Sequence, residues 1–181
     1  MAIPRTQRND GPAILSYGFR PFFLLGAAYS GASILFWLPM LYGTAATARL
    51  FAPVDWHIHE MLFGYVAAIV TGFLLTAIPN WTGRLPVQGG PLLVLVLLWL
   101  AGRIAVFFSA TIGWVAAMTI DGLFLFAVVV AAAIEIVAGR NWRNLKVLVP
   151  VTVLLIANLA FHAEAHFAGV SDIGRRLALG A

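Results

Sequence analysis

The sequence contains no cysteine and very few charged residues. Only 10% of its 181 residues are Asp, Glu, Lys or Arg, whereas a soluble domain has about 25%. Without cysteine there can be no disulfide, no thiolate metal ligand and no thiol nucleophile. The sequence also lacks a glycine-rich phosphate loop and a Ser–His–Asp order. Any metal ion must therefore be bound by His, Asp, Glu or Met.

Hydrophobic residues make up 62% of the chain, with a mean hydropathy of +0.95. A soluble domain of about 150 residues buries only about 70% of the surface that its unfolded chain exposes, so most of this chain must be surrounded by lipid. We predict an all-α fold, a polytopic transmembrane helix bundle with a cytoplasmic N-terminus. A transmembrane helix needs about 20 apolar residues, and five segments qualify: about 20–42, 57–78, 91–109, 114–138 and 147–168.

The remaining segments are short. Residues 1–18 are predicted to be a cytoplasmic N-terminal tail. Residues 169–181, which turn apolar at their end, are predicted to begin a further, truncated span. We therefore expect the partner of this bundle to be the rest of a longer chain or a second copy of the protein.

The basic residues predict the orientation. A net charge of +4 would suggest a nucleic-acid partner in a soluble protein, but here the excess is interpreted as loop charge, which is enriched on the cytoplasmic side. An N-terminus inside the cell places seven basic residues in the cytoplasm and three outside: Arg5, Arg8, Arg20, Arg84, Arg140, Arg143 and Lys146, against Arg49, Arg175 and Arg176. We expect no nucleic-acid partner.

All four histidines are expected at one face of the membrane. His57 and His59 begin the second span, and His162 and His166 end the fifth. His162 and His166 share a helix face because they are four residues apart, whereas His57 and His59 diverge unless the helix begins after them. Neutral imidazole suits copper, iron, zinc and nickel, and it also serves as an axial haem ligand. The alternative is that these histidines only pack and form hydrogen bonds at the interface.

Acidic residues near the histidines are candidates to support them. Asp55, Glu60 and Glu164 are expected to accept hydrogen bonds that fix the imidazole tautomers. Glu60 is also a candidate ligand, since it shares a helix face with His57. The small residues Gly64, Ala68 and Gly72 recur every fourth position on that face, which favours close helix packing there. This pattern turns Glu60 into the bundle.

Arg103 and Asp121 are charged residues inside predicted spans. A charge at the bilayer centre costs at least about 2.5–3.5 kcal/mol, so we expect the two to pair, or Arg103 to meet an anionic group. With Glu60 they suggest a second function, a transporter or channel with an intramembrane polar path. A structural or regulatory scaffold is a third. Glu135, near the opposite end of its span, is expected to meet Arg140 or Arg143.

Several motifs resemble the NnrS family. They are GFRPFFLLGA at 18–27, the H-x-H-E block that begins at His57, PNWTG at 79–83, and NLAFHAEA in the fifth span. The resemblance implies a bacterial inner-membrane protein that contains haem and copper and is linked to nitric oxide metabolism or protection from nitrosative stress. It also implies a longer chain of about a dozen spans. It does not assign a reaction, and it carries the ligand role to His57, His59, Glu60, His162 and His166 only as candidates.

Overall fold

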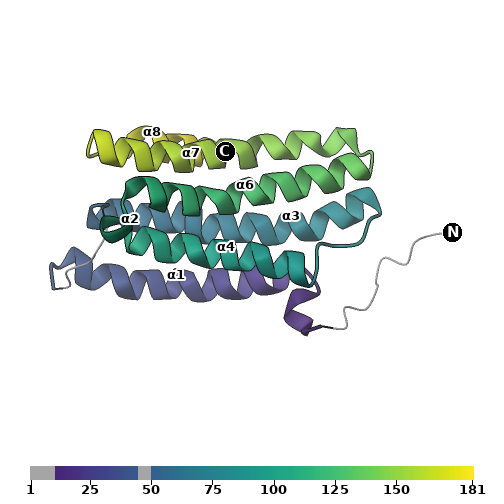
Figure 1. Cartoon of the computed structure of the whole chain (residues 1–181), viewed down its shortest axis with the longest axis horizontal. Coiled ribbons are helices and arrows are strands. Elements are labelled where there is room, and N and C mark those ends of the chain that lie inside the picture. Colours follow the sequence, from purple (N-terminus) through teal and green to yellow (C-terminus); the bar gives the residue numbers. More distant parts are fainter. Residues whose placement is uncertain (1–10, 45–49) are drawn as a thin grey trace.

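The computed structural model describes residues 11–44 and 50–181, and all regular secondary structure in these residues is helical. Five helical segments are long and apolar enough to cross a membrane, which confirms the predicted fold class. They lie side by side along one long axis (Figure 1). Their bounds are α1 Phe19–Leu41, a continuous helix Pro53–Thr82, α4 Gly90–Phe107, α6 Trp114–Ala138 and a helix Trp142–Phe167.

Two of these long segments are composite. The second consists of α2 (Pro53–His59), the π-helical turn η2 (Glu60–Val66) and α3 (Ala67–Thr82). The fifth begins with the 3₁₀ segment η3 (Trp142–Val147) and continues as α7 (Leu148–Phe167). Three short helices complete the described chain: η1 (Ala13–Leu15), α5 (Ser109–Ile112) and α8 (Asp172–Gly180).

The second span begins earlier than its hydropathy predicts. Pro53 is its first residue, a position where the missing N–H costs nothing because it has no helical partner. His57 and His59 therefore both lie inside the helix, which excludes the alternative that the helix starts after them. The helix ends at Gly83, whose φ of 69° is a left-handed conformation that favours glycine.

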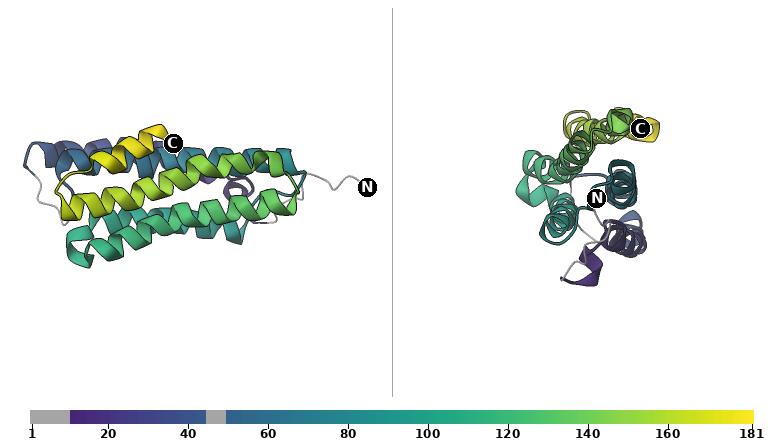
Figure 2. Two further views of the ribbon diagram at one scale, coloured as in Figure 1. Left: turned by 90° about the horizontal axis from the view of Figure 1, so that it is seen from above. Right: turned by 90° about the vertical axis from the view of Figure 1, so that its right-hand side faces the viewer.

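Helix α6 lies at the centre of the packing. It contacts α3, α4 and α7, while α1 packs on α3. The end-on view of Figure 2 shows this arrangement, with α7 and α8 at one edge and α1 near the other. The predicted seam of small residues is a real close approach: Gly72 lies against Phe22 and Phe23 of α1, and Ala68 against Gly26.

Helix α8 folds back along α7. Gly174 lies directly against the backbone of Phe161 in α7, where a side chain would not fit. Helix α8 has nine residues, which is fewer than the about 20 that cross a membrane. That residues 169–181 begin a further span stays a prediction. Residues 1–10 of the predicted tail 1–18 lie outside the described residues. Residues 11–18 are described and include η1. The orientation of the bundle also remains a prediction.

Candidate metal centre

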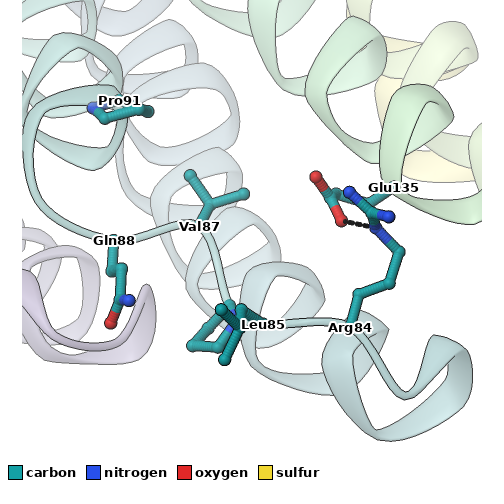
Figure 3. Close-up of a pocket in the computed structure, with 7 residues that line it drawn as sticks. Arg84, Leu85, Val87, Gln88, Pro91 and Glu135 are labelled. Atoms are coloured by element: carbon teal, nitrogen blue, oxygen red, sulfur yellow. Dashed lines mark hydrogen bonds and ion pairs between the residues drawn. The ribbon is translucent and has the colours of Figure 1, made fainter. Parts of the chain in front are cut away.

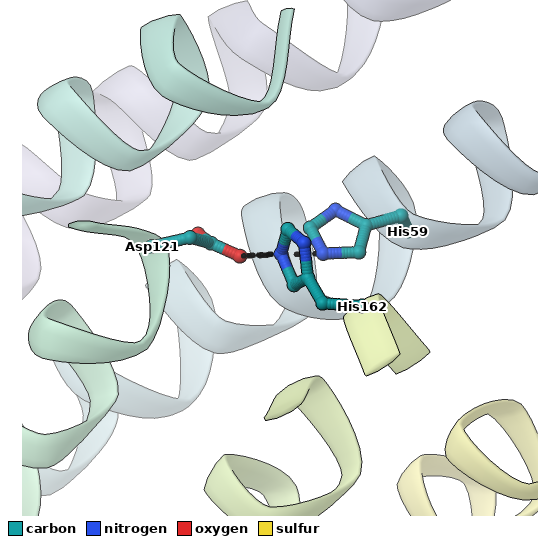
Figure 4. Close-up of side chains that lie close together, drawn as sticks. All are labelled: His59, Asp121 and His162. Carbon is teal, nitrogen blue, oxygen red and sulfur yellow. Dashed lines mark hydrogen bonds and ion pairs between the residues drawn. The ribbon is translucent and has the colours of Figure 1, made fainter. Parts of the chain in front are cut away.

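His59, Asp121 and His162 meet inside the bundle (Figure 4). They come from three elements: α2, α6 and α7. Each lies five to seven residues from the same end of the bundle, which at 1.5 Å per residue is a depth of about 8–10 Å. All three side chains are buried. The site therefore lies within the membrane-spanning region and close to one face of it.

The two imidazoles converge on one oxygen atom. Asp121 Oδ2 lies 3.2 Å from His162 Nε2 and 3.2 Å from His59 Nε2. The approach of His162 has hydrogen-bond geometry, but His59 Nε2 has no aligned hydrogen-bond partner among the described residues. The ligand atoms of the three residues lie within 4.8 Å of one another. A buried imidazole nitrogen that faces a carboxylate oxygen without an aligned hydrogen bond is a natural position for a cation.

A second ring of polar side chains surrounds this group. Arg103 of α4 bridges the two buried carboxylates, with Nη1 donating to Glu60 Oε2 at 2.6 Å and Nη2 donating to Asp121 Oδ1. Tyr29 of α1 donates its hydroxyl to Glu60 Oε2 at 2.5 Å. Asn158 of α7 donates to Asp121 Oδ2 at 2.7 Å. The predicted pair of Arg103 and Asp121 is thus present, as part of a larger network.

The charges of this cluster do not cancel. Glu60 and Asp121 supply two negative charges, and Arg103 supplies one positive charge. With both imidazoles neutral, the described cluster carries one net negative charge in a region that excludes water. Because an uncompensated buried charge is costly, the cluster is complementary to a bound cation.

The donor set fits a transition-metal ion. Two imidazole nitrogens and one carboxylate oxygen are ligands that suit copper, zinc, iron and nickel. Metal–ligand bonds of about 2.0–2.2 Å would draw the three ligand atoms, which lie within 4.8 Å of one another, toward a common ion.

Comparison with known families agrees with the motifs. The family model described as NnrS protein matches residues 13–181, which is most of the chain. The chain belongs to the NnrS family. No curated protein and no solved structure matches it. It is therefore a multi-pass membrane protein of the NnrS family whose described residues bring His59, Asp121 and His162 together.

A haem does not fit between His59 and His162 of this NnrS protein. Both imidazoles reach the same carboxylate oxygen, and their ring centroids are 5.0 Å apart. The rings of Phe51 and Phe161 each lie 5.1 Å from the His59 ring, and that of Phe63 lies 4.9 Å from it. A porphyrin placed here would displace both the carboxylate and these rings. The triad is suited to a single ion.

The other two predicted histidines lie apart from the triad. His57 stacks on Trp37 of α1 with ring centroids 4.2 Å apart, and His166 stacks on Trp114 of α6 at 4.6 Å. His57 is half-buried and His166 is exposed. His162 was expected to lie beside His166 on one helix face. In the structure it lies beside His59 instead.

Asp55 and Glu164 do not contact the imidazoles in any described hydrogen bond. Asp55 accepts a hydrogen bond from Ser171 at 2.7 Å. The Glu164 carboxylate accepts backbone N–H groups of Ile173 and Gly174, at 2.8 and 3.1 Å. These acids hold the first turn of α8, where a negative charge is favourable. Their role in the described structure is to attach α8 to α2 and α7.

Glu135 pairs with Arg84, so the expectation that it meets Arg140 or Arg143 was wrong. Arg84 Nε donates to Glu135 Oε2 at 2.6 Å, and this hydrogen bond raises the pKa of Arg84. The loop that follows Gly83 folds toward α6 and brings the two together. They line a pocket of about 440 Å³ with Leu85, Val87 and neighbouring loop residues (Figure 3). The pocket lies at the opposite end of the bundle from the triad.

Sequence reasoning did not identify Asn158 and Tyr29. Both are polar residues inside apolar segments, IANLAF and GAAYSG. Asn158 also lies four residues before His162, and therefore on the same helix face. That spacing was the available signal for Asn158. No spacing connects Tyr29 to Glu60, which is 31 residues away in sequence.

Proposed function

We propose that this NnrS-family protein binds a copper ion at His59, Asp121 and His162 and acts in nitric oxide metabolism or protection from nitrosative stress. The observation that supports it is the buried convergence of two imidazoles on one carboxylate, within a cluster whose net charge is −1 when both imidazoles are neutral. Copper is chosen because imidazole is among its preferred ligands and because the family resemblance implies it. A bound copper ion would supply one-electron redox chemistry.

The residues of the chain have distinct roles in this proposal. His59 and His162 supply nitrogen ligands, and Asp121 supplies one oxygen and a negative charge. The aromatic rings of Phe51, Phe63 and Phe161 exclude water from the site. Low local polarity strengthens the attraction between the carboxylate and a cation.

The haem that the resemblance implies is proposed to bind outside the triad. His57 and His166 are the remaining histidines, and neither ring is enclosed as fully as those of His59 and His162. We propose them as candidate residues to hold it. We also propose that the protein lies in a bacterial inner membrane with its N-terminus in the cytoplasm and the triad near the outer face.

Substitution of a triad ligand tests the metal centre. We expect His162→Ala and Asp121→Asn to lose most of the bound copper, because each removes one of three ligands. Copper per protein is measured by elemental analysis of the purified full-length protein. His166→Ala is the matched control, since it removes a histidine from the same helix outside the triad, and it is expected to retain copper. Full copper content in His162→Ala and Asp121→Asn would reject the site.

The same preparations test the link to nitric oxide. Nitric oxide is added to the oxidised protein while the Cu(II) electron paramagnetic resonance (EPR) signal is recorded. We expect the signal to change in the unmodified protein and in His166→Ala. A Cu(II) signal that is indifferent to nitric oxide would contradict this part of the proposal.

The alternative function, a transporter or channel, required a polar path through Glu60, Arg103 and Asp121. In the structure these three side chains pair with one another and are buried. This arrangement favours a closed binding site over a path. A flux in liposomes that depends on Asp121 and is indifferent to metal would favour the transporter.

A further inference from the structure

We propose that Glu60 is a positioning residue of the metal centre and not one of its ligands. In this arrangement Arg103 and Tyr29 hold Glu60, and Glu60 fixes the orientation and tautomer of His59. The inference deepens the proposed function and rests on it. The sequence suggested two candidate roles for Glu60, metal ligand and hydrogen-bond acceptor for an imidazole, and the inference retains only the second.

Both oxygens of Glu60 are already engaged. Oε1 lies 3.2 Å from His59 Nδ1, and Oε2 accepts hydrogen bonds from Arg103 at 2.6 Å and Tyr29 at 2.5 Å. The carboxylate is completely buried. Glu60 therefore lies on the Nδ1 side of the His59 ring, together with its donors Arg103 and Tyr29. The candidate ligand atoms lie on the opposite side, at Nε2.

This contact selects one tautomer of His59. A carboxylate beside Nδ1 favours a proton on Nδ1, which donates to Glu60 Oε1. Nε2 is then left with its lone pair, which is the form that binds a metal ion. Consistent with this assignment, Nε2 lies 3.2 Å from Asp121 Oδ2 without an aligned hydrogen bond. Two electron-rich atoms in this arrangement are complementary to a cation that binds both.

Arg103 sets the distance between the Glu60 and Asp121 carboxylates. One guanidinium bonds both Glu60 and Asp121, so it fixes the positioning carboxylate relative to the ligand carboxylate. Its contact with Asp121 uses Oδ1 and leaves Oδ2 facing the imidazoles. Gly64 makes this possible, because a side chain there would lie 3.0 Å from both Arg103 Nη1 and Glu60 Oε2. Asp121 is therefore inferred to bind the ion through one oxygen.

The test is Glu60→Gln in the full-length protein, with Cu(II) as the probe. The amide keeps a similar shape but removes the charge that favours a proton on His59 Nδ1. Loss of a residue that supports a ligand typically lowers metal affinity about 10- to 100-fold, and we expect a loss of this size in competition with a chelator of known affinity. Pulsed EPR should still count two coordinated imidazoles.

Two further variants complete the experiment. Glu135→Gln is the matched control, because it neutralises a carboxylate that pairs with Arg84 away from the site, and its copper affinity should be unchanged. Tyr29→Phe removes only a hydroxyl donor to Glu60 and provides a milder variant if Glu60→Gln does not fold. We expect its copper affinity to fall about three- to tenfold, consistent with the loss of one hydrogen bond.

The outcomes separate the two proposals. Unchanged copper affinity in both Glu60→Gln and Tyr29→Phe would overturn the positioning role. Loss of copper in Glu60→Gln as complete as in Asp121→Asn would identify Glu60 as a ligand, which also overturns it. Copper retained in His162→Ala would instead reject the metal centre itself, and the positioning role with it.

Discussion

Arg103 shows how this protein holds a charge inside a membrane-spanning helix. Its guanidinium is buried and bonded to Glu60 and Asp121. Three charged groups that would each be unfavourable alone are stable together, because each hydrogen bond is made in a medium that offers no water. The cost of removing one member is therefore larger than the net contribution of any single pair.

Replacement of Arg103 tests this interdependence. Arg103→Met leaves two buried carboxylates without their counter-charge, and breaking a buried ion pair in this way costs about 3–5 kcal/mol. We expect a large decrease in the thermal unfolding midpoint in detergent. Arg84→Met is the control, since the Arg84 side chain is 44% exposed in its pair with Glu135, and it should show no resolvable change. Equal midpoints for the two variants would contradict the network.

At the scale of helices, glycine determines how closely α4 and α6 approach. A Cβ atom at Gly102 would lie 2.7 Å from Asp121 Oδ1 and 3.2 Å from Asp121 Cα. Asp121 cannot move aside easily, because Arg103, Asn158 and the two histidines contact it. The position of the His59–Asp121–His162 triad therefore depends on a residue that has no polar side chain.

Substitution at Gly102 should accordingly affect both packing and metal binding. We expect Gly102→Ala to destabilise the bundle by about 1–3 kcal/mol, as for other overpacked sites, and to lower copper affinity. Gly31→Ala in α1 is the control, since a Cβ there meets nothing within 4 Å. Alanine is favoured over glycine inside a helix by about 0.5–1 kcal/mol, so the control should be neutral or slightly stabilised. A destabilised control with a normal Gly102→Ala would contradict this account.

For the molecule as a whole, all the candidate histidines lie toward one end of the bundle and the Arg84–Glu135 pocket lies at the other. The basic loop residues predict that the histidine end faces out of the cell. This assignment decides from which side of the membrane a metal ion would reach the triad. The two ends can be distinguished experimentally because the chain has no cysteine of its own.

Single introduced cysteines test the orientation. Val170→Cys lies at the histidine end and Ala138→Cys at the other, and both positions are exposed. The outer membrane is made permeable while the inner membrane stays intact, and a maleimide that cannot cross the inner membrane is added. We then expect labelling of Val170→Cys only. Labelling of both positions after full lysis is the control for accessibility. Labelling of Ala138→Cys alone in intact cells would reverse the orientation.

The amino-acid sequence by itself determined that the protein spans a membrane, that it has five apolar helices, and that it belongs to the NnrS family. These follow from local properties: the length of each apolar run, the glycine and proline residues that end it, and motifs such as PNWTG. The sequence also placed all four histidines at one end of the bundle, because the spans alternate in direction.

Only the tertiary structure decided which of these residues meet. His57 and His59 are both near the end of one helix, yet the rotation and packing of that helix turn His59 toward Asp121 and His57 toward Trp37. The position of Asp121 beside the two imidazoles and the hydrogen bond of Glu60 with Tyr29 depend on how α1, α6 and α7 pack around the second span. Such contacts are set by the fit of side chains between helices. Hydropathy along the sequence indicates which segments are apolar, but not which side chains pack together.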